Sequence, residues 1–194
     1  SPIRAELLSG NKDEARKFCG FSDDKPVVLI IGGSLGAAAV NDAVRKILPQ
    51  LLPKYNVIHL CGKGKLDESL KGTAGYVQYE YIKKELADLF ALADVVISRA
   101  GANAICELLA LKKPNILIPL PAAASRGDQI LNANSFKKQG FSEVIDEEKI
   151  TDDLLLETIN NVYNNRSKYV EAMEKSPQQN GVEAVISLIK EVTK

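Results

Sequence analysis

The stretch ADVVISRAGANAICELLALKKPNILIPLP, residues 93–121, contains the pattern that decides the fold. An apolar run at 94–98 is followed by a helical pattern that begins after Gly101, and a second apolar run follows at 114–118. A strand, a helix and a strand in this order predict a β-α-β unit, whose two strands lie parallel in one sheet.

The same alternation extends along most of the chain. Short apolar runs rich in Val, Ile and Leu predict six strands, at residues 26–31, 56–61, 75–79, 94–98, 114–118 and 142–145. Helical spacing predicts helices at residues 38–52, 86–93, around 105–109, and at 128–139, 152–163 and 182–192. We therefore predict an α/β fold, a doubly wound, Rossmann-like parallel sheet with helices on both faces.

Composition limits the class of protein. The chain has 194 residues, and its 25 basic and 25 acidic residues give a formal net charge of zero, which argues against a nucleic-acid partner. Its three cysteines lie far apart and it has one histidine, so neither a disulfide framework nor a metal site is predicted. We expect a cytoplasmic protein that uses no cofactor.

The first candidate site is the glycine-rich turn GGSLGA, residues 32–37, which follows the first predicted strand and opens a helix. Ligands of such sheets bind beyond the carboxyl ends of the strands. Free N–H groups at the helix start favour an anion such as phosphate, and a tight turn without a ligand is the alternative. Because residue 31 is Ile, the dinucleotide fingerprint is incomplete, and Gly62-Lys63-Gly64 does not match a Walker loop.

The second candidate site follows the fourth predicted strand. Arg99 ends the strand, Gly101 and Ala102 open a helix with a second set of free N–H groups, and Glu107 follows about one turn later. The Glu107 carboxylate can accept both hydroxyls of a ribose or sugar, or it can complement the helix dipole alone. Arg99 can bind a ligand or serve only as a salt-bridge partner.

The third candidate site is segment 119–129, where prolines leave a strand and polar residues open a helix. Asp128, Gln129 and Asn132 offer carboxylate and amide groups that suit sugar hydroxyls, and Asp128 also fits the N-cap of the helix. Three such loops at one sheet edge suit a central diphosphate with a ribose on one side and a sugar on the other. The residues thus predict a nucleotide-sugar site.

Two other features have plainer interpretations. His59 lies within a buried-strand pattern and is predicted to be a hydrogen-bonded core residue. The lysine pairs at 83–84 and 112–113 are predicted to lie in solvent.

Several ordered motifs resemble the MurG family of bacterial peptidoglycan glycosyltransferases. They are GGSLGA at 32–37, ADVVISRAGA at 93–102, DQILNA at 128–133, and the opening SPIR at 1–4, which is similar to the family's interdomain linker. This family transfers N-acetylglucosamine from UDP-N-acetylglucosamine to lipid I, which forms lipid II. The resemblance implies a two-domain GT-B enzyme of which this chain is the donor-binding half.

The same resemblance implies a division of the chain and its setting. Residues 1–194 would form a single UDP-sugar donor-binding domain, with the interdomain linker and first helix at 1–25. The terminal helix within 176–194 would pack on the missing amino-terminal domain, which would supply the lipid I site and the catalytic base. The full-length protein would lie in the cytoplasm, peripherally on the inner face of the plasma membrane, and this half alone would be inactive.

Position by position, the resemblance implies donor-binding roles. Arg4 and Ser34, with amides near Gly33 and Gly36, would contact the diphosphate, and the Ile82 backbone would read the uracil. Glu107 would hold both ribose hydroxyls, while Ala102, Asp128 and Gln129 would meet the sugar with Asn132 in support. The full set is Arg4, Gly33, Ser34, Gly36, Ile82, Arg99, Gly101, Ala102, Glu107, Asp128, Gln129 and Asn132. No catalytic residue is expected in this chain, and the role of Arg99 stays open.

Three positions depart from the family pattern, and other functions stay open. Leu35 stands where many members have Gln, Ala104 where many have Thr, and Asp128 where others have Gln or His. One alternative is the stand-alone donor-binding subunit of a two-subunit N-acetylglucosaminyltransferase. Another is a non-catalytic UDP-binding module, and a dehydrogenase is a third.

Overall fold

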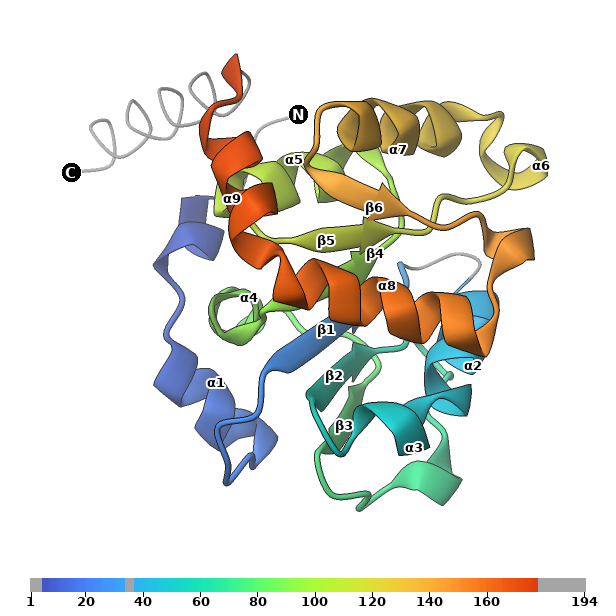
Figure 1. Ribbon diagram of the computed structural model, residues 1–194. Coiled ribbons are helices and arrows are strands. Elements are labelled where there is room, and N and C mark those ends of the chain that lie inside the picture. Colours follow the sequence, from blue (N-terminus) through green and yellow to red (C-terminus); the bar gives the residue numbers. More distant parts are fainter. Residues whose placement is uncertain (1–4, 34–36, 178–194) are drawn as a thin grey trace.

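Six parallel strands form the central sheet (Figure 1). They are β1 (Val27–Ile31), β2 (Asn56–Leu60), β3 (Tyr76–Tyr79), β4 (Val95–Ser98), β5 (Asn115–Leu117) and β6 (Ser142–Val144). Their order across the sheet is β3-β2-β1-β4-β5-β6, and all neighbouring pairs are parallel. The computed structural model describes residues 5–33 and 37–177. Each predicted apolar run contains the observed strand, so the six predicted strands are confirmed.

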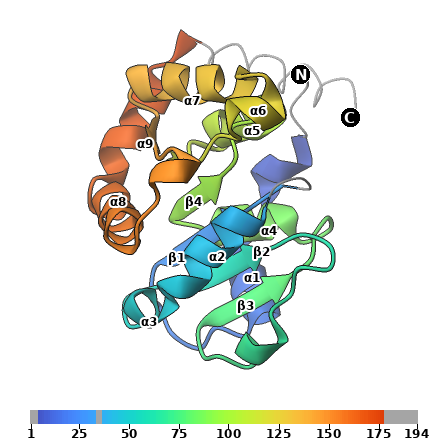
Figure 2. The same ribbon diagram turned by 90° about the vertical axis from the view of Figure 1, so that its right-hand side faces the viewer.

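Helices cover both faces of this sheet. They are η1 (Ala5–Ser9), α1 (Lys12–Cys19), α2 (Ala38–Lys46), α3 (Leu48–Leu51), η2 (Glu68–Leu70), α4 (Leu86–Leu92), α5 (Ala102–Leu111), α6 (Ala122–Ser125), α7 (Asp128–Lys138), η3 (Glu147–Lys149), α8 (Asp152–Asn164) and α9 (Arg166–Glu174). Figures 1 and 2 show α8 across one face and α4 with α1 on the other. The predicted doubly wound, Rossmann-like α/β fold is confirmed.

The core lies where the central strands meet these helices. Val28, Leu29 and Ile30 of β1 are completely buried, as are Val96 and Ile97 of β4. Burying each large aliphatic side chain stabilises the fold by about 1.5–3 kcal/mol. The apolar side chains therefore hold β1 and β4 rigidly side by side, and the loops that leave their carboxyl ends start from fixed positions.

Two predictions about local structure are wrong. Segment 38–52 is not one helix, because α2 ends at Lys46 and the short α3 begins at Leu48. Pro49 explains the break, since its ring has no N–H to donate and clashes with the carbonyl four residues earlier. Lys113 is not fully solvated: its Nζ donates to the Ala93 carbonyl over 2.9 Å, and burial lowers its pKa to about 8. The predicted helix at 182–192 lies outside the described residues.

Candidate ligand-binding site

The centre of the sheet contains a topological switch point. β1 and β4 are neighbours, but the chain leaves β1 through α2 toward β2 and leaves β4 through α5 toward β5, on the opposite side. The two connections diverge and leave a crevice at the carboxyl ends of the strands, which is where ligands of such folds bind. Gly33 follows β1 at this crevice and Gly101 follows β4.

The larger of two cavities at this edge has a volume of about 670 Å³. Its lining comes from the ends of four strands and from α4 and α5: Ile31, Gly33, Leu60, Gly62, Lys63, Glu80, Tyr81, Ile82, Lys83, Leu86, Phe90, Ser98, Ala104, Glu107 and Leu108. On α5, Ala104, Glu107 and Leu108 share one helix face, because they are three and four residues apart. The half-buried Glu107 thus places a carboxylate in a mainly apolar cavity.

The smaller cavity has a volume of about 490 Å³ and adjoins the larger one. It is lined by Ile31, Gly33, Ser98, Arg99, Gly101, Ala102, Asn103, Ala104, Leu120 and Gln129. Four of these residues, Ile31, Gly33, Ser98 and Ala104, also line the larger cavity. One extended ligand can therefore occupy both cavities. Its middle part would lie over the carboxyl ends of β1 and β4, where the cavities meet.

Helix α5 begins where the cavities meet, since Ala102 lines the smaller cavity and Ala104 lines both. Ala37 precedes α2 and Gly101 precedes α5, and neither position makes a side-chain cap hydrogen bond. The start of α5 directs backbone N–H groups and a partial positive charge toward the junction, which is therefore suited to an anion.

Arg99 holds the backbone beneath this junction. Its guanidinium donates to the Ile118 carbonyl over 3.1 Å and pairs with the Glu147 carboxylate over 2.9 Å. A Cβ placed on Gly33 would lie 3.9 Å from the Arg99 Cγ, and Gly33 itself has a φ of 78°. This left-handed conformation favours glycine, because a side chain there would be strained. Arg99 thus links the ends of β4 and β5 under the glycine-rich turn.

Gln129 and Asn132 of α7 hold the backbone before Gly101. The Gln129 Oε1 accepts hydrogen bonds from the amides of Ala100 and Leu120, over 3.1 and 3.0 Å. Asn132 Nδ2 donates to the Ala100 carbonyl over 3.0 Å. These hydrogen bonds fix the Gln129 side-chain oxygen. Its Nε2 then lies next to Gly101, 3.7 Å from the position that a Cβ on that residue would take.

The predicted site residues fall into groups. Gly33, Ile82 and Glu107 line the larger cavity, and Gly33, Arg99, Gly101, Ala102 and Gln129 line the smaller one. Asn132 acts from behind through Ala100, while the exposed Asp128 lines neither cavity. The N-cap interpretation of Asp128 is wrong, since Gly127 is the N-cap and Asp128 begins α7. Arg4, Ser34 and Gly36 lie outside the described residues.

Sequence reasoning overlooked one wall of the larger cavity. Gly62 and Lys63 line it, directly after β2, although the sequence GKG was set aside as a poor Walker loop. The position of Gly62 after a predicted strand could have indicated this wall, because the loops that follow parallel strands all lie at the carboxyl edge of the sheet.

Residues 5–33 and 37–177 provide neither a metal site nor a membrane-spanning helix. Within these ranges, no group of three or more His, Cys, Asp or Glu side chains is placed to hold a metal ion. None of the helices in this part of the chain has the length and apolar character that crossing a bilayer requires.

Comparison with known sequences gives a consistent family. Residues 27–189 match the family model described as glycosyltransferase family 28 C-terminal domain. Proteins named UDP-N-acetylglucosamine--N-acetylmuramyl-(pentapeptide) pyrophosphoryl-undecaprenol N-acetylglucosamine transferase are similar to the whole chain. Identity is 60% over 194 residues for the protein of Lachnospira eligens, and 62% over 192 residues for that of Lachnoclostridium phytofermentans. The alignments cover 100% and 99% of this chain but 55% and 54% of those proteins, so the chain spans about half their length.

Solved structures agree with this assignment. The crystal structure of Acinetobacter baumannii MurG superposes with a TM-score of 0.71 at 27% identity, over 97% of this chain and 55% of that one. A kitacinnamycin glycosyltransferase superposes with a TM-score of 0.67 at 19% identity, over 86% of this chain and 43% of that one. The second likeness supports the fold alone, and both are to one half of a longer chain.

Proposed function

This chain belongs to the glycosyltransferase family 28 C-terminal domain family, and from that premise we propose that it is the donor-binding half of a MurG-type N-acetylglucosaminyltransferase. Its ligand is UDP-N-acetylglucosamine, and the whole enzyme transfers the sugar to lipid I to form lipid II. The observation that carries the proposal is the pair of adjoining cavities that meet at the start of α5, beside Gly33. The larger cavity, the junction and the smaller cavity follow one another in the order of the nucleoside, the diphosphate and the sugar of a nucleotide sugar.

The uridine occupies the larger cavity. Its base lies against the apolar side chains, and the backbone of Ile82 reads the uracil edge. The Glu107 carboxylate accepts hydrogen bonds from both ribose hydroxyls, because two oxygens on one side chain match a vicinal diol. Charge-assisted hydrogen bonds of this kind are worth about 1.5–3 kcal/mol each.

The diphosphate lies at the junction. Backbone N–H groups at Gly33 and at the starts of α2 and α5 face its oxygens, and the two helix dipoles favour its charge. Arg4, Ser34 and Gly36 complete this site in the proposal. During transfer, negative charge grows on the departing UDP, and the same preorganised groups stabilise it.

The sugar occupies the smaller cavity. The Ala102 amide and the Gln129 Nε2 face the hydroxyls of N-acetylglucosamine, and Asn132 keeps Ala100 and hence Gly101 in place. Asp128 reaches the sugar only from the rim, since it lines neither cavity. Arg99 supports the junction from below rather than contacting the sugar.

The rest of the reaction belongs to the remainder of the protein. The relatives are nearly twice as long as this chain, so a further domain supplies the lipid I site and the catalytic base of an inverting displacement. That domain also brings the enzyme to the inner face of the plasma membrane, as a peripheral protein in the cytoplasm.

Calorimetry tests the donor site directly. We expect this chain to bind UDP, to bind UDP-N-acetylglucosamine more tightly than UDP-glucose, and to ignore ADP. Equal affinity for UDP and for both UDP-sugars would instead indicate a UDP-binding module without sugar recognition. Absence of heat with UDP at high micromolar protein would contradict the proposal. The full-length protein, assayed with a lipid I analogue, tests the transfer itself.

A further inference from the structure

Two side chains of α2 hold both ends of the loop that forms one wall of the larger cavity. Asn41 Nδ2 donates to the Cys61 carbonyl over 2.8 Å, and Arg45 Nη2 donates to the Lys65 carbonyl over 2.7 Å. Asn41 and Arg45 are four residues apart and therefore lie on one face of the helix. We call loop 61–65 the wall loop, because its residues Gly62 and Lys63 line the cavity.

A chain of hydrogen bonds connects the two side chains through the sheet. Asn41 donates its Nδ2 to Cys61, so its Oδ1 accepts from His59 Nε2 over 2.7 Å. His59 Nδ1 then accepts from the Tyr76 hydroxyl over 2.8 Å, and Arg45 Nε donates to the Tyr76 oxygen over 3.3 Å. Every donor in the chain points from Arg45 toward Cys61, which requires a neutral imidazole.

His59 is thus a hydrogen-bonded core residue, as the sequence predicts, and it is completely buried. Burial, together with the nearby Arg45 charge, lowers its pKa to about 3. The imidazole therefore stays neutral throughout the physiological pH range, and its hydrogen bonds to Tyr76 and Asn41 select the tautomer protonated at Nε2.

The same residues reach the glycine-rich turn. The Gly32 amide donates to the Leu60 carbonyl over 3.3 Å, and a Cβ on Gly32 would lie 3.5 Å from Asn41 Oδ1. A Cβ on Gly62 would lie 3.7 Å from the Gly33 carbonyl oxygen. Asn41 accordingly donates to the wall loop and lies close to Gly32, where the turn that follows β1 begins.

We propose that Asn41 and Arg45 are positioning residues that fix the wall loop relative to Gly32 and Gly33 and so couple nucleoside binding to diphosphate binding. Neither side chain lines the two cavities, so each acts through the backbone that it holds. The inference rests on the proposed UDP site. Uridine contacts only the larger cavity, so it can still bind when the wall loop is displaced. UDP must contact the wall loop and Gly33 at the same time, so a displaced loop weakens its binding.

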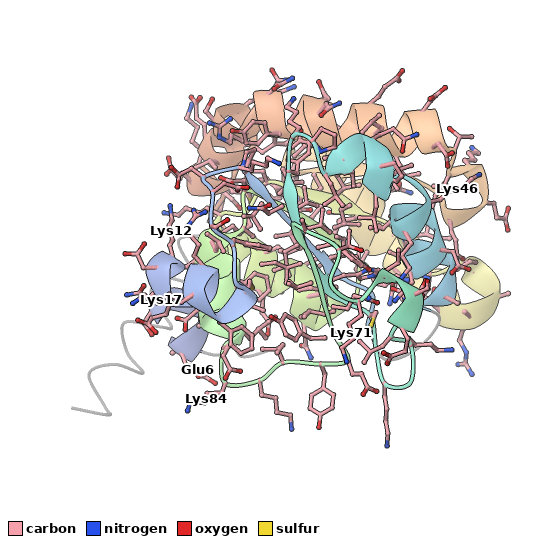
Figure 3. All side chains as sticks on the ribbon, turned by 90° about the horizontal axis from the view of Figure 1, so that it is seen from below. Glu6, Lys12, Lys17, Lys46, Lys71 and Lys84 are labelled. Carbon is pink, nitrogen blue, oxygen red and sulfur yellow. The ribbon has the colours of Figure 1, made fainter. Side chains whose placement is uncertain are left out.

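The test compares UDP with uridine in Arg45→Met, which keeps the aliphatic stem but removes the donors. We expect UDP to bind at least about fivefold more weakly, with uridine affinity unchanged within about twofold, as expected for the loss of the hydrogen bonds that Arg45 donates. Arg45→Lys can still donate to Lys65 and recovers part of the loss. The control is Lys46→Met, because Lys46 lies at the edge of the molecule beside α8 (Figure 3). This variant should leave the affinities for UDP and for uridine unchanged.

A second variant and a second readout keep the inference falsifiable. Asn41→Asp still accepts from His59 but places a carboxylate oxygen against the Cys61 carbonyl, and it is expected to reproduce the selective loss of UDP. Without any ligand, the Gly62 to Lys65 amides should exchange hydrogen faster in Arg45→Met than in Lys46→Met. Equal losses for UDP and uridine, or no loss and no faster exchange, would overturn the inference. If the wild type fails to bind UDP while the exchange result holds, the proposed function fails instead.

Discussion

Arg99 and Glu147 form a nearly buried ion pair, with side chains 6% and 18% exposed and the Arg99 Nη2 2.9 Å from the Glu147 Oε1. The pair joins the end of β4 to the segment after β6. Arg99 also donates to the Ile118 carbonyl at the end of β5, so three neighbouring strand ends are linked through one guanidinium. This link holds the base of the smaller cavity in place.

Removal of one partner should destabilise the domain. Glu147→Ala leaves a buried guanidinium without its carboxylate, and we expect the free energy of unfolding to fall by about 3 kcal/mol. Urea denaturation measures the change. Lys46→Ala breaks the exposed Lys46–Asp152 pair and serves as the control, with an expected loss of about 0.5 kcal/mol or less. A similar small loss in both variants would show that the Arg99 pair contributes little.

Glu107 should determine recognition of the ribose. Wild-type protein is expected to prefer UDP over 2′-deoxy-UDP, because the deoxy ligand offers one hydroxyl to the carboxylate. Glu107→Gln should weaken UDP binding by about tenfold or more, since it removes the charge from these hydrogen bonds. It should also reduce the preference between the two ligands. Calorimetry with both ligands provides the measurement, and a Glu107→Gln variant that still discriminates normally would place the ribose elsewhere.

Gln129 should separate sugar recognition from folding. Gln129→Glu keeps an oxygen that accepts from the Ala100 and Leu120 amides, but it removes the Nε2 donor. We expect an unchanged unfolding midpoint, unchanged UDP affinity, and loss of the extra affinity for UDP-N-acetylglucosamine. Gln129→Ala is the matched comparison, because it leaves both amides without their acceptor and should cost about 2 kcal/mol of stability. If Gln129→Glu binds the UDP-sugar normally, the sugar does not contact Nε2.

The strands were predictable because their signal is local. Each strand is a short apolar run, and the loops at the carboxyl edge follow from strand order alone, so Gly33, Gly101 and Glu107 could be assigned to one edge. Contacts between distant segments could not be predicted. Nothing near Arg99 in the sequence indicates Glu147, and Gln129 gives no sign that its oxygen binds the Ala100 amide. Asp128 was misassigned for a different reason, because the adjacent Gly127, in a left-handed conformation, is the N-cap of α7.

The buried His59 should make stability depend on pH. Its pKa is lowered to about 3 in the folded protein, whereas an exposed histidine titrates near 6.5. As pH falls below 6.5, the unfolded chain takes up a proton that the folded protein cannot accept, so the free energy of unfolding decreases. Between pH 7 and pH 5 this loss amounts to about 2 kcal/mol.

His59→Gln isolates this contribution. A glutamine amide can donate toward Asn41 and accept from Tyr76 without titrating, so the variant should preserve the hydrogen-bond chain in a neutral form. Urea denaturation at pH 7, 6 and 5 should show the wild type losing about 2 kcal/mol more than the variant, because all other groups titrate alike in both proteins. Equal losses would mean that His59 gains a proton in the folded state, and the single direction assigned to the chain from Arg45 to Cys61 would then be wrong.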